Sequence, residues 1–322
     1  MKHVLVVGQI HEAGMEILQN YGDLTVDVIT DPGADIPVEK VAAADAVLIR
    51  YGVLTEAHIE NATRLRVVSR HGVGCDNLPV AALSARGVPV AIVGPVSAVS
   101  VAEQTMAMLL SLAKKIALYD QAVRSGNWSI RDELAISELA GKTLLLLGFG
   151  NIGREVTKRA LAFDMNVLVY DPFVSSDVIT AAGGAAVDEW RAVLGEVDVL
   201  SVHVPLSAET KKLIDAEVLA TMKPTAILLN AARGGLIDEC ALYRALSSRM
   251  SAGGAGIDTF EAEPLSPDSP LLSLPNVVVS PHSAALTEEA AKRMGEVAAE
   301  NVIAGLEDRL DPQLVINRSE LG

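Results

Sequence analysis

The segment 144–171, LLLLGFGNIGREVTKRALAFDMNVLVYD, restricts the fold of this chain more than any other part of the sequence. Its glycines have the spacing G-x-G-x-x-G, directly after four leucines and directly before a stretch of helical composition. Such glycines let the backbone approach a pyrophosphate at a helix N-terminus, where free N–H groups and the helix dipole favour anions. The segment therefore predicts a strand, turn, helix and strand that bind a dinucleotide. The residues expected at this site are Gly148, Gly150, Asn151, Ile152 and Gly153.

Asp171 lies at the end of the second predicted strand, eighteen residues after Gly153. A carboxylate there accepts hydrogen bonds from the adenosine ribose and repels a 2′-phosphate, so it predicts NAD as the cofactor rather than NADP. The alternative is a corner whose glycines serve only close packing and whose aspartate is there by chance. The complete βαβ setting favours the NAD site.

Short apolar runs alternate with Ala- and Glu-rich helical stretches along the chain. In the first hundred residues the runs are VLVV, LTVDVI, AVLI, LRVVS and VPVAIV; from residue 143 they are TLLLLG, NVLVYD, VDVLSVHV, AILLN, GAGID and VVVS. This alternation predicts an α/β protein with two parallel sheets. Between them we expect one long helix over 100–122, capped by Ser100 with Glu103 and apolar on more than one face. Its own domains or a second subunit would cover those faces.

Charge and cysteine usage exclude several classes of protein. The formal net charge of −15 argues against a nucleic-acid or acidic-membrane partner, which would need clustered Lys and Arg. Cys75 and Cys240 are far apart and lack metal-ligand spacing, so we expect free thiols, no metal site and a cytoplasmic location. The opening MKHVLVVGQI predicts a strand rather than a signal peptide, and no apolar run reaches the roughly 18 residues of a membrane helix.

Three chemically suited side chains follow predicted strands of the second half. Arg233 follows AILLN, Glu263 follows GAGID, and His282 follows VVVS. Because parallel strands present their carboxyl ends at one edge of a sheet, these side chains can converge. Hydride transfer between NAD and a hydroxy acid needs a cation for the carboxylate, a group that exchanges the hydroxyl proton, and a residue that orients that group. Taken singly, each has a simpler interpretation, as a helix-cap ion pair, a solvated turn glutamate or a loop histidine.

The sequence resembles the D-isomer-specific 2-hydroxyacid dehydrogenases. The motifs that carry the resemblance are SRHGVGCDNLPV, LLLLGFGNIG, VYDP, VHVPLSAET, NAARGGLIDE, GIDTFEAEP and SPHSAALTEEA, which together span nearly the whole chain. The resemblance implies that Arg233 binds the substrate carboxylate and carbonyl, that His282 is the acid/base, and that Glu263 hydrogen-bonds the histidine. It also implies substrate contacts near Val73 and Gly74. The remaining residues that it places at the cofactor site are His203, Pro205, Thr210, Ala231, Ala232 and Asp258.

Pattern and resemblance together predict the domain organisation. A flavodoxin-like substrate domain would comprise residues 1–98 and 288–322, and a Rossmann NAD domain residues 99–287, with a cleft that closes on substrate. The resemblance and the two-faced helix both predict a homodimer. Since the sequence ends at Gly322, no C-terminal regulatory domain for serine feedback is expected.

The identity of the hydroxy acid depends on a possible second anionic pocket. Arg50, Arg70 and His71 follow predicted strands of the first half and can supply it, or they are ordinary surface charges and internal ion pairs. The first interpretation favours 3-phosphoglycerate dehydrogenase-like activity, and the alternative is hydroxypyruvate or glyoxylate reduction. A hypothesis of another class is an NAD-sensing corepressor similar to the C-terminal-binding proteins, which share the fold.

Overall fold

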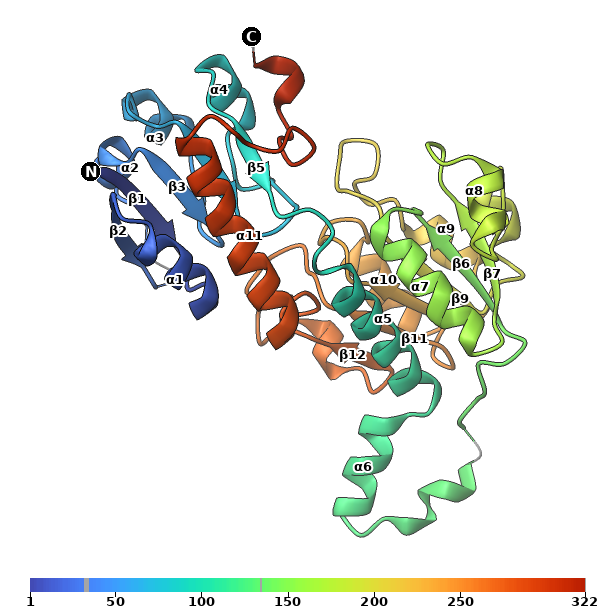
Figure 1. The fold of residues 1–322 in the computed structure, drawn as a ribbon. Helices are drawn as coiled ribbons and strands as arrows, with labels where there is room; N and C mark the ends of the chain where they lie inside the picture. Colours follow the sequence, from blue (N-terminus) through green and yellow to red (C-terminus); the bar gives the residue numbers. More distant parts are fainter. Residues whose placement is uncertain (32–34, 134, 322) are drawn as a thin grey trace. The chain divides into compact units, whose positions relative to one another are not determined.

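The computed structural model describes residues 1–31, 35–133 and 135–321. The chain divides into two compact units, one formed by Met1–Ser97 with Leu286–Gly322 and the other by Ala98–Ala285. Each unit is a parallel sheet with helices on both faces (Figure 1). The predicted α/β class is confirmed.

The first unit contains a five-stranded sheet in the order β2-β1-β3-β4-β5, which is the flavodoxin-like order. Every pair is parallel, with Val4 opposite both Val26 and Ala46. Its strands are β1 (Lys2–Val7), β2 (Leu24–Ile29), β3 (Ala46–Ile49), β4 (Val67–Arg70) and β5 (Val90–Ile92). Its helices are α1 (Glu12–Asn20), α2 (Val38–Ala43), α3 (Glu56–Asn61), α4 (Val80–Ala85), α11 (Glu288–Leu306) and the 3-10 helix η4 (Arg318–Glu320).

Helix α11 belongs to the first unit although it follows the whole second unit in the sequence (Figure 1). Thr287 caps it by accepting a hydrogen bond from Ala290 N, and two glutamates in the first turn suit the helix dipole. The helix packs on β3, β4, β5 and α1. It crosses α1 at close range, because a Cβ built on Gly14 would lie 2.4 Å from the carbonyl oxygen of Gly295.

The second unit contains a seven-stranded parallel sheet in the order β12-β11-β10-β9-β6-β7-β8. The order reverses between β6 and β9, as in a Rossmann fold, and the reversal creates a crevice at the carboxyl ends of the strands. The strands are β6 (Thr143–Leu147), β7 (Asn166–Tyr170), β8 (Ala185–Ala186), β9 (Val199–Val202), β10 (Ile227–Asn230), β11 (Gly254–Ile257) and β12 (Val277–Val279). The helices are α5 (Ala98–Ala113), α6 (Ile116–Arg124), η1 (Trp128–Glu133), α7 (Asn151–Ala162), α8 (Ser176–Ala181), η2 (Trp190–Val193), α9 (Ala216–Thr221), α10 (Glu239–Leu246) and η3 (Pro270–Ser273).

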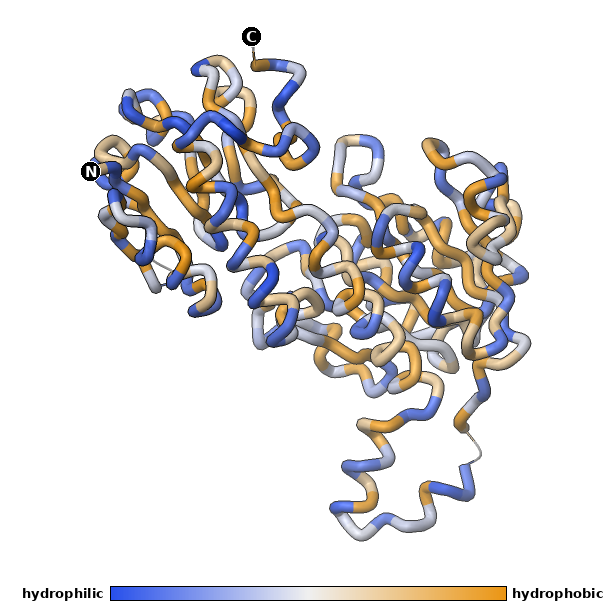
Figure 2. Tube along the Cα trace, viewed as in Figure 1, coloured by the Kyte–Doolittle hydropathy of each residue, from blue (hydrophilic) through white to orange (hydrophobic). Residues whose placement is uncertain are grey.

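The four leucines of β6 are buried because helices cover both faces of the sheet. Leu144 and Leu146 belong to one apolar cluster, with residues of α5 and α7, whereas Leu145 and Leu147 belong to another, with residues of α9 and α10. Figure 2 shows these apolar strands running through the interior of each unit. A strand buried on both faces carries a continuous apolar run rather than an alternating one. The continuous run of leucines therefore reflects the position of β6 inside the sheet, between β9 and β7.

The long helix predicted over 100–122 is wrong in two details. The chain is helical from Ala98, so Ser100 lies inside α5 and is buried rather than capping it. The helix also breaks at Lys115, whose φ of 49° is left-handed, and α6 begins at Ile116. Helix α5 packs closely on the sheet, because a Cβ on Gly256 of β11 would lie 2.8 Å from the Cβ of Met108.

Helix α6 and η1 form an arm that extends away from the seven-stranded sheet (Figure 1). The arm, residues 116–133, and the segment that follows it expose large apolar side chains, which are Ile116, Val123, Trp128 and Ile136. Trp128 is the most exposed of these four residues, with 66% of its surface accessible. Within the described part of the chain, no helix has both the length and the apolar character needed to cross a membrane.

Candidate active site

Neighbouring backbone leaves no room for a side chain at two glycines of the loop between β6 and α7, whereas the third glycine has free space beside it. Gly148 has φ +99°, and a Cβ there would lie 2.5 Å from the carbonyl oxygen of His203. A Cβ on Gly153 would lie 2.4 Å from the carbonyl oxygen of Gly148. Gly150 caps α7, and a Cβ on it would meet no protein atom within 4 Å. No side chain therefore covers the N-terminus of α7 at Gly150, so a pyrophosphate can approach its N–H groups.

Asp171, directly after β7, is tied to the glycine loop. One carboxylate oxygen accepts a hydrogen bond from Phe149 N at 2.7 Å, and the other accepts one from Phe173 N at 2.9 Å. Each carboxylate oxygen can accept more than one hydrogen bond. The side chain therefore keeps capacity for a ribose hydroxyl while it fixes the loop beside it.

Arg154 is a further candidate for binding the pyrophosphate, which the glycine motif alone does not single out. It lies in the first turn of α7, and its guanidinium stands 4.7 Å from the centre of the Phe149 ring. The side chain is exposed, and none of the carboxylates in the described ranges forms an ion pair with it. Its place in the sequence could have indicated it, because a basic residue directly after the last glycine of the motif lies in the first turn of the helix.

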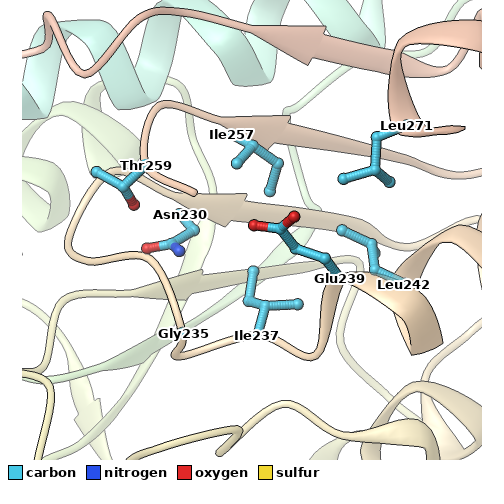
Figure 3. Close-up of a pocket in the computed structure, with 8 residues that line it drawn as sticks. All are labelled: Asn230, Gly235, Ile237, Glu239, Leu242, Ile257, Thr259 and Leu271. Atoms are coloured by element: carbon cyan, nitrogen blue, oxygen red, sulfur yellow. The ribbon is translucent and has the colours of Figure 1, made fainter. Parts of the chain in front are cut away.

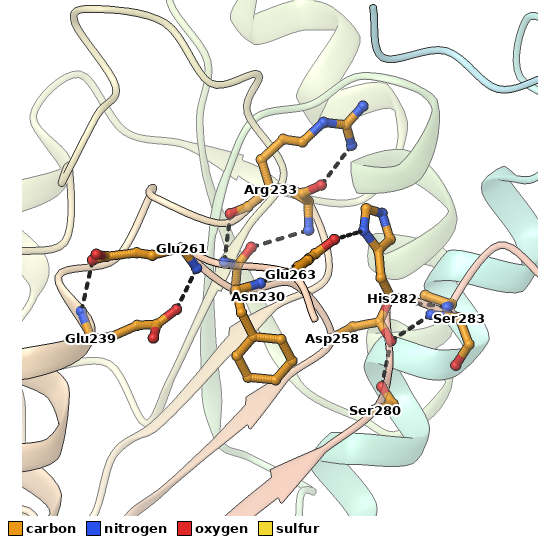
Figure 4. Close-up of polar contacts among 12 residues, drawn as sticks. Asn230, Arg233, Glu239, Asp258, Glu261, Glu263, Ser280, His282 and Ser283 are labelled. Carbon is orange, nitrogen blue, oxygen red and sulfur yellow. Dashed lines mark hydrogen bonds and ion pairs between the residues drawn. The ribbon is translucent and has the colours of Figure 1, made fainter. Parts of the chain in front are cut away.

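His282 and Glu263 form the central contact of the site (Figure 4). His282 Nδ1 lies 2.7 Å from Glu263 Oε2, and Glu263 Oε1 accepts a hydrogen bond from Phe260 N at 3.0 Å. Partial burial opposes ionisation of this carboxyl group, but the hydrogen bonds from His282 and Phe260 N, with the charges of His282 and Arg233, lower the pKa of Glu263. The ring uses Nδ1 for the glutamate, so Nε2 is the nitrogen left for proton exchange.

Asp258 holds the backbone that carries His282. Its side chain is completely buried and accepts hydrogen bonds from Ser280 Oγ at 2.5 Å and from the N–H groups of Ser283 and Ala284 at 3.0 Å each. His282 has φ +51°, and its N–H donates to the carbonyl of Asp258 at 2.8 Å. The role that the resemblance implies for Asp258 at the cofactor site stays a prediction, and its side chain contacts Ser280, Ser283 and Ala284.

Arg233 stands on a sharp turn after β10. Asn230, the last residue of β10, accepts from Ala232 N at 3.0 Å and donates to the carbonyl of Arg233 at 2.8 Å. Gly235 follows with φ +77°. Arg233 Nη1 donates to the carbonyl of Ala232 at 2.7 Å, and its charge acts on Glu263. The small side chains of Ala231 and Ala232 are buried in the two apolar clusters.

His203, Pro205 and Thr210 lie at the carboxyl end of β9, at the same edge of the sheet. His203 Nε2 lies 2.8 Å from Ser201 Oγ, and its Nδ1 is buried without a hydrogen-bond partner. Burial lowers the pKa of His203 to about 4, so the ring is neutral at physiological pH. Thr210 Oγ donates to the carbonyl of Pro205 at 2.6 Å and closes the turn between them.

Arg50, Arg70 and His71 of the first unit are the candidates for a second anionic pocket, and the structure shows their contacts. Arg70 directs its guanidinium at backbone carbonyls, with bonds to Gly74, Ile49, Arg50 and His71 at 2.6–3.1 Å. His71 is buried, and desolvation together with Arg50 and Arg70 lowers its pKa to about 4. Arg70 therefore braces backbone carbonyls and His71 is neutral, while the predicted anionic pocket on these residues stays a prediction. Arg50 donates to the carbonyl of Gln9 at 2.5 Å and remains the candidate cation, and exposed Val73 and half-buried Gly74 lie on the loop that Arg70 braces.

Comparisons with known proteins agree with this geometry. Residues 106–284 match the family model described as D-isomer specific 2-hydroxyacid dehydrogenase, NAD binding domain. The D-3-phosphoglycerate dehydrogenase of Methanocaldococcus jannaschii is 40% identical over 98% of this chain, which spans 59% of that relative. The glyoxylate reductase of Korarchaeum cryptofilum is 36% identical over 97% of this chain and 95% of its own length. A D-lactate dehydrogenase from Aquifex aeolicus, solved with NAD and lactic acid, superposes with a TM-score of 0.88 at 29% identity, covering 99% of each chain.

Two glycine substitutions should separate packing from cofactor binding. Gly148→Ala places a Cβ against the His203 carbonyl at a left-handed φ, so it should destabilise the fold by more than about 2 kcal/mol. Gly150→Ala meets no protein atom and should change the melting temperature little, while the affinity for NADH, measured by fluorescence titration, falls by at least about tenfold. Unchanged NADH affinity in Gly150→Ala would mean that the pyrophosphate does not approach this turn.

Proposed function

The chain belongs to the D-isomer specific 2-hydroxyacid dehydrogenase family, and on that premise we propose that it interconverts a D-2-hydroxy acid and its 2-keto acid with NAD(H). The observation that carries this proposal is the 2.7 Å contact between His282 and Glu263 beside Arg233. These residues lie at the carboxyl edge of the sheet whose first β-α turn is the glycine loop.

The three residues divide the work of the reaction. Arg233 supplies a fixed cation whose planar guanidinium can hold the substrate carboxylate and the neighbouring carbonyl oxygen together. His282 Nε2 donates a proton to that oxygen during reduction and removes it during oxidation. Glu263 holds the ring through Nδ1 and, as an ionised carboxylate, favours the protonated imidazole.

The NAD site fits the residues present around the glycine loop. The backbone at Gly148, Gly150 and Gly153 and the charge of Arg154 would hold the pyrophosphate, and Asp171 would accept from the ribose and disfavour a 2′-phosphate. When bound, the cofactor supplies or accepts the hydride. His203 contributes a neutral ring at the same edge of the sheet, and so adds no positive charge there.

We assign the substrate the class of a 3-carbon 2-keto acid with a second anionic group, as in 3-phosphohydroxypyruvate. The M. jannaschii relative bears the name of that activity, and Arg50 supplies one cation outside the second unit. Val73 and Gly74 would offer backbone N–H groups to the substrate carboxylate. The alternative is reduction of glyoxylate or hydroxypyruvate. It is favoured by the match to glyoxylate reductase over nearly its full length. It is also favoured because Arg70 is hydrogen-bonded to backbone carbonyls and His71 carries no charge, so neither offers a free cation for a second anionic group.

We further propose a cytoplasmic homodimer in which the arm of residues 116–133 contacts a second copy. The support is the group of exposed apolar residues on the arm, since such patches usually mark interfaces.

A substrate panel tests the proposed function. Oxidation of NADH should be followed at the nicotinamide absorbance with 3-phosphohydroxypyruvate, hydroxypyruvate and glyoxylate. We expect the phosphorylated acid to have the highest kcat/KM, and Arg50→Ala to lower that value by at least about tenfold while sparing glyoxylate. A preference for glyoxylate that Arg50→Ala does not change would establish the alternative. Absence of turnover with every 2-keto acid would contradict the proposal and favour an NAD-sensing corepressor.

Glu263→Gln should change the pH dependence in a defined direction. The lowered pKa of Glu263 keeps the carboxylate charged across the neutral range, where it favours the protonated imidazole. The basic limb of kcat/KM for reduction, and the acidic limb for oxidation, should therefore both move to lower pH in the glutamine variant. Glu217→Gln, which removes an exposed charge from α9, is the control and should move neither limb. Identical profiles for Glu263→Gln and the parent would remove Glu263 from its role.

A further inference from the structure

Two neighbouring loops at the carboxyl edge of the seven-stranded sheet carry the arginine and the glutamate of the proposed site. The arginine loop, residues 231–238, follows β10 and leads into α10, and the glutamate loop, residues 258–263, follows β11. In the proposed function Arg233 holds the substrate and Glu263 holds the histidine that exchanges a proton with it, so the distance between these loops must be fixed.

The loops approach each other closely at Gly234. A Cβ built on Gly234 would lie 1.7 Å from the carbonyl oxygen of Phe260 and 2.9 Å from Glu261 N. No side chain fits between the two backbones here, so the contact limits how close the loops come. It does not prevent them from separating.

A reciprocal pair of hydrogen bonds joins the loops at Glu239 and Glu261 (Figure 4). Glu239 Oε1 accepts from Glu261 N at 2.5 Å, and Glu261 Oε1 accepts from Glu239 N at 3.2 Å. Each side chain thus bonds to the backbone of the other residue. We call this pair of bonds the clasp.

The side chain of Glu239 is half-buried. Figure 3 shows its carboxylate between the ends of β10 and β11, where it lines a cavity of about 10 Å³ with Asn230 and Thr259. Thr259 Oγ is buried without a partner at this cavity, which is large enough for at most one water molecule. Burial raises the pKa of Glu239, the hydrogen bond from Glu261 N opposes the rise, and the charges of Glu261 and Glu263 add to it.

We propose that Glu239 is a positioning residue: through the clasp it holds the glutamate loop against the arginine loop, and so sets Glu263 and Arg233 at their working separation. This inference rests on the proposed function for its catalytic consequence, but the clasp itself does not. Glu239 contacts the backbone of Glu261, two residues before Glu263, and its own N–H begins the helix that follows the arginine loop.

The clasp needs an acceptor oxygen at Glu239 but not a negative charge. Three glutamates, Glu239, Glu261 and Glu263, lie within electrostatic range of one another, so a charge on Glu239 is unfavourable there. Glutamine keeps an acceptor oxygen and the length of the side chain. Glu239→Gln should therefore preserve the bond from Glu261 N, which Glu239→Ala removes, whereas Glu263→Gln should not behave like the parent.

The test compares Glu239→Ala and Glu239→Gln with a matched control, Glu217→Ala. Glu217 is likewise a first-turn glutamate, on α9 of the same unit, but its exposed side chain forms no clasp. We expect Glu239→Ala to lower kcat/KM for the 2-keto acid by at least about tenfold with unchanged affinity for NADH, and to move the basic limb of the reduction profile to lower pH as Glu263 loosens. Glu239→Gln should stay within about threefold of the parent with an unmoved limb.

Hydrogen exchange of peptides covering 258–264 gives a readout that does not depend on turnover. The amides of this loop should exchange at least about tenfold faster in Glu239→Ala than in the parent, Glu239→Gln or Glu217→Ala. Unchanged exchange in Glu239→Ala would overturn the clasp, and equal loss of activity in the alanine and glutamine variants would overturn its independence of charge. An intact clasp in a parent that turns over no 2-keto acid would instead contradict the proposed function alone.

Discussion

The buried carboxylate of Asp258 determines where the candidate histidine lies. A completely buried carboxylate is costly unless hydrogen bonds compensate it, and here three donors from the following segment do so: Ser280 Oγ and the N–H groups of Ser283 and Ala284. These bonds bracket His282 and hold it at a left-handed φ of +51°, which is uncommon for residues other than glycine. The contact between His282 and Glu263 depends on this anchor, because both residues follow strands that Asp258 ties together.

The same device recurs at other strand ends of the second unit. Asn230 ends β10 and bonds to Ala232 N and the Arg233 carbonyl, while Asp171 follows β7 and bonds to Phe149 N and Phe173 N. In each case a polar side chain at the end of an apolar strand shapes a loop that bears a functional residue. The sheet supplies the common edge, and these side chains supply the conformation of the loops on it. The Glu239 clasp extends the principle from within a loop to a contact between two loops.

The fold and the convergence of the site could be predicted because they depend on local patterns. Apolar runs such as TLLLLG and AILLN located strands, and the rule that parallel strands share a carboxyl edge placed Arg233, Glu263 and His282 together. The break at Lys115 and the role of Arg70 could not be predicted, because both follow from tertiary contacts. Nothing in SRHGVGCDNLPV reveals that Arg70 turns back onto four carbonyl groups. Strand β8, with two residues, is too short to leave a pattern.

In the proposed reaction a hydride passes directly from the cofactor to one face of a keto acid at this edge of the sheet. The decisive measurement uses NADH with deuterium at both C4 positions and hydroxypyruvate or its 3-phosphate, followed by mass spectrometry and chiral analysis of the product. We expect a D-2-hydroxy acid that carries one deuterium at C2. A product of L configuration, or a product whose C2 hydrogen comes from the solvent, would contradict it.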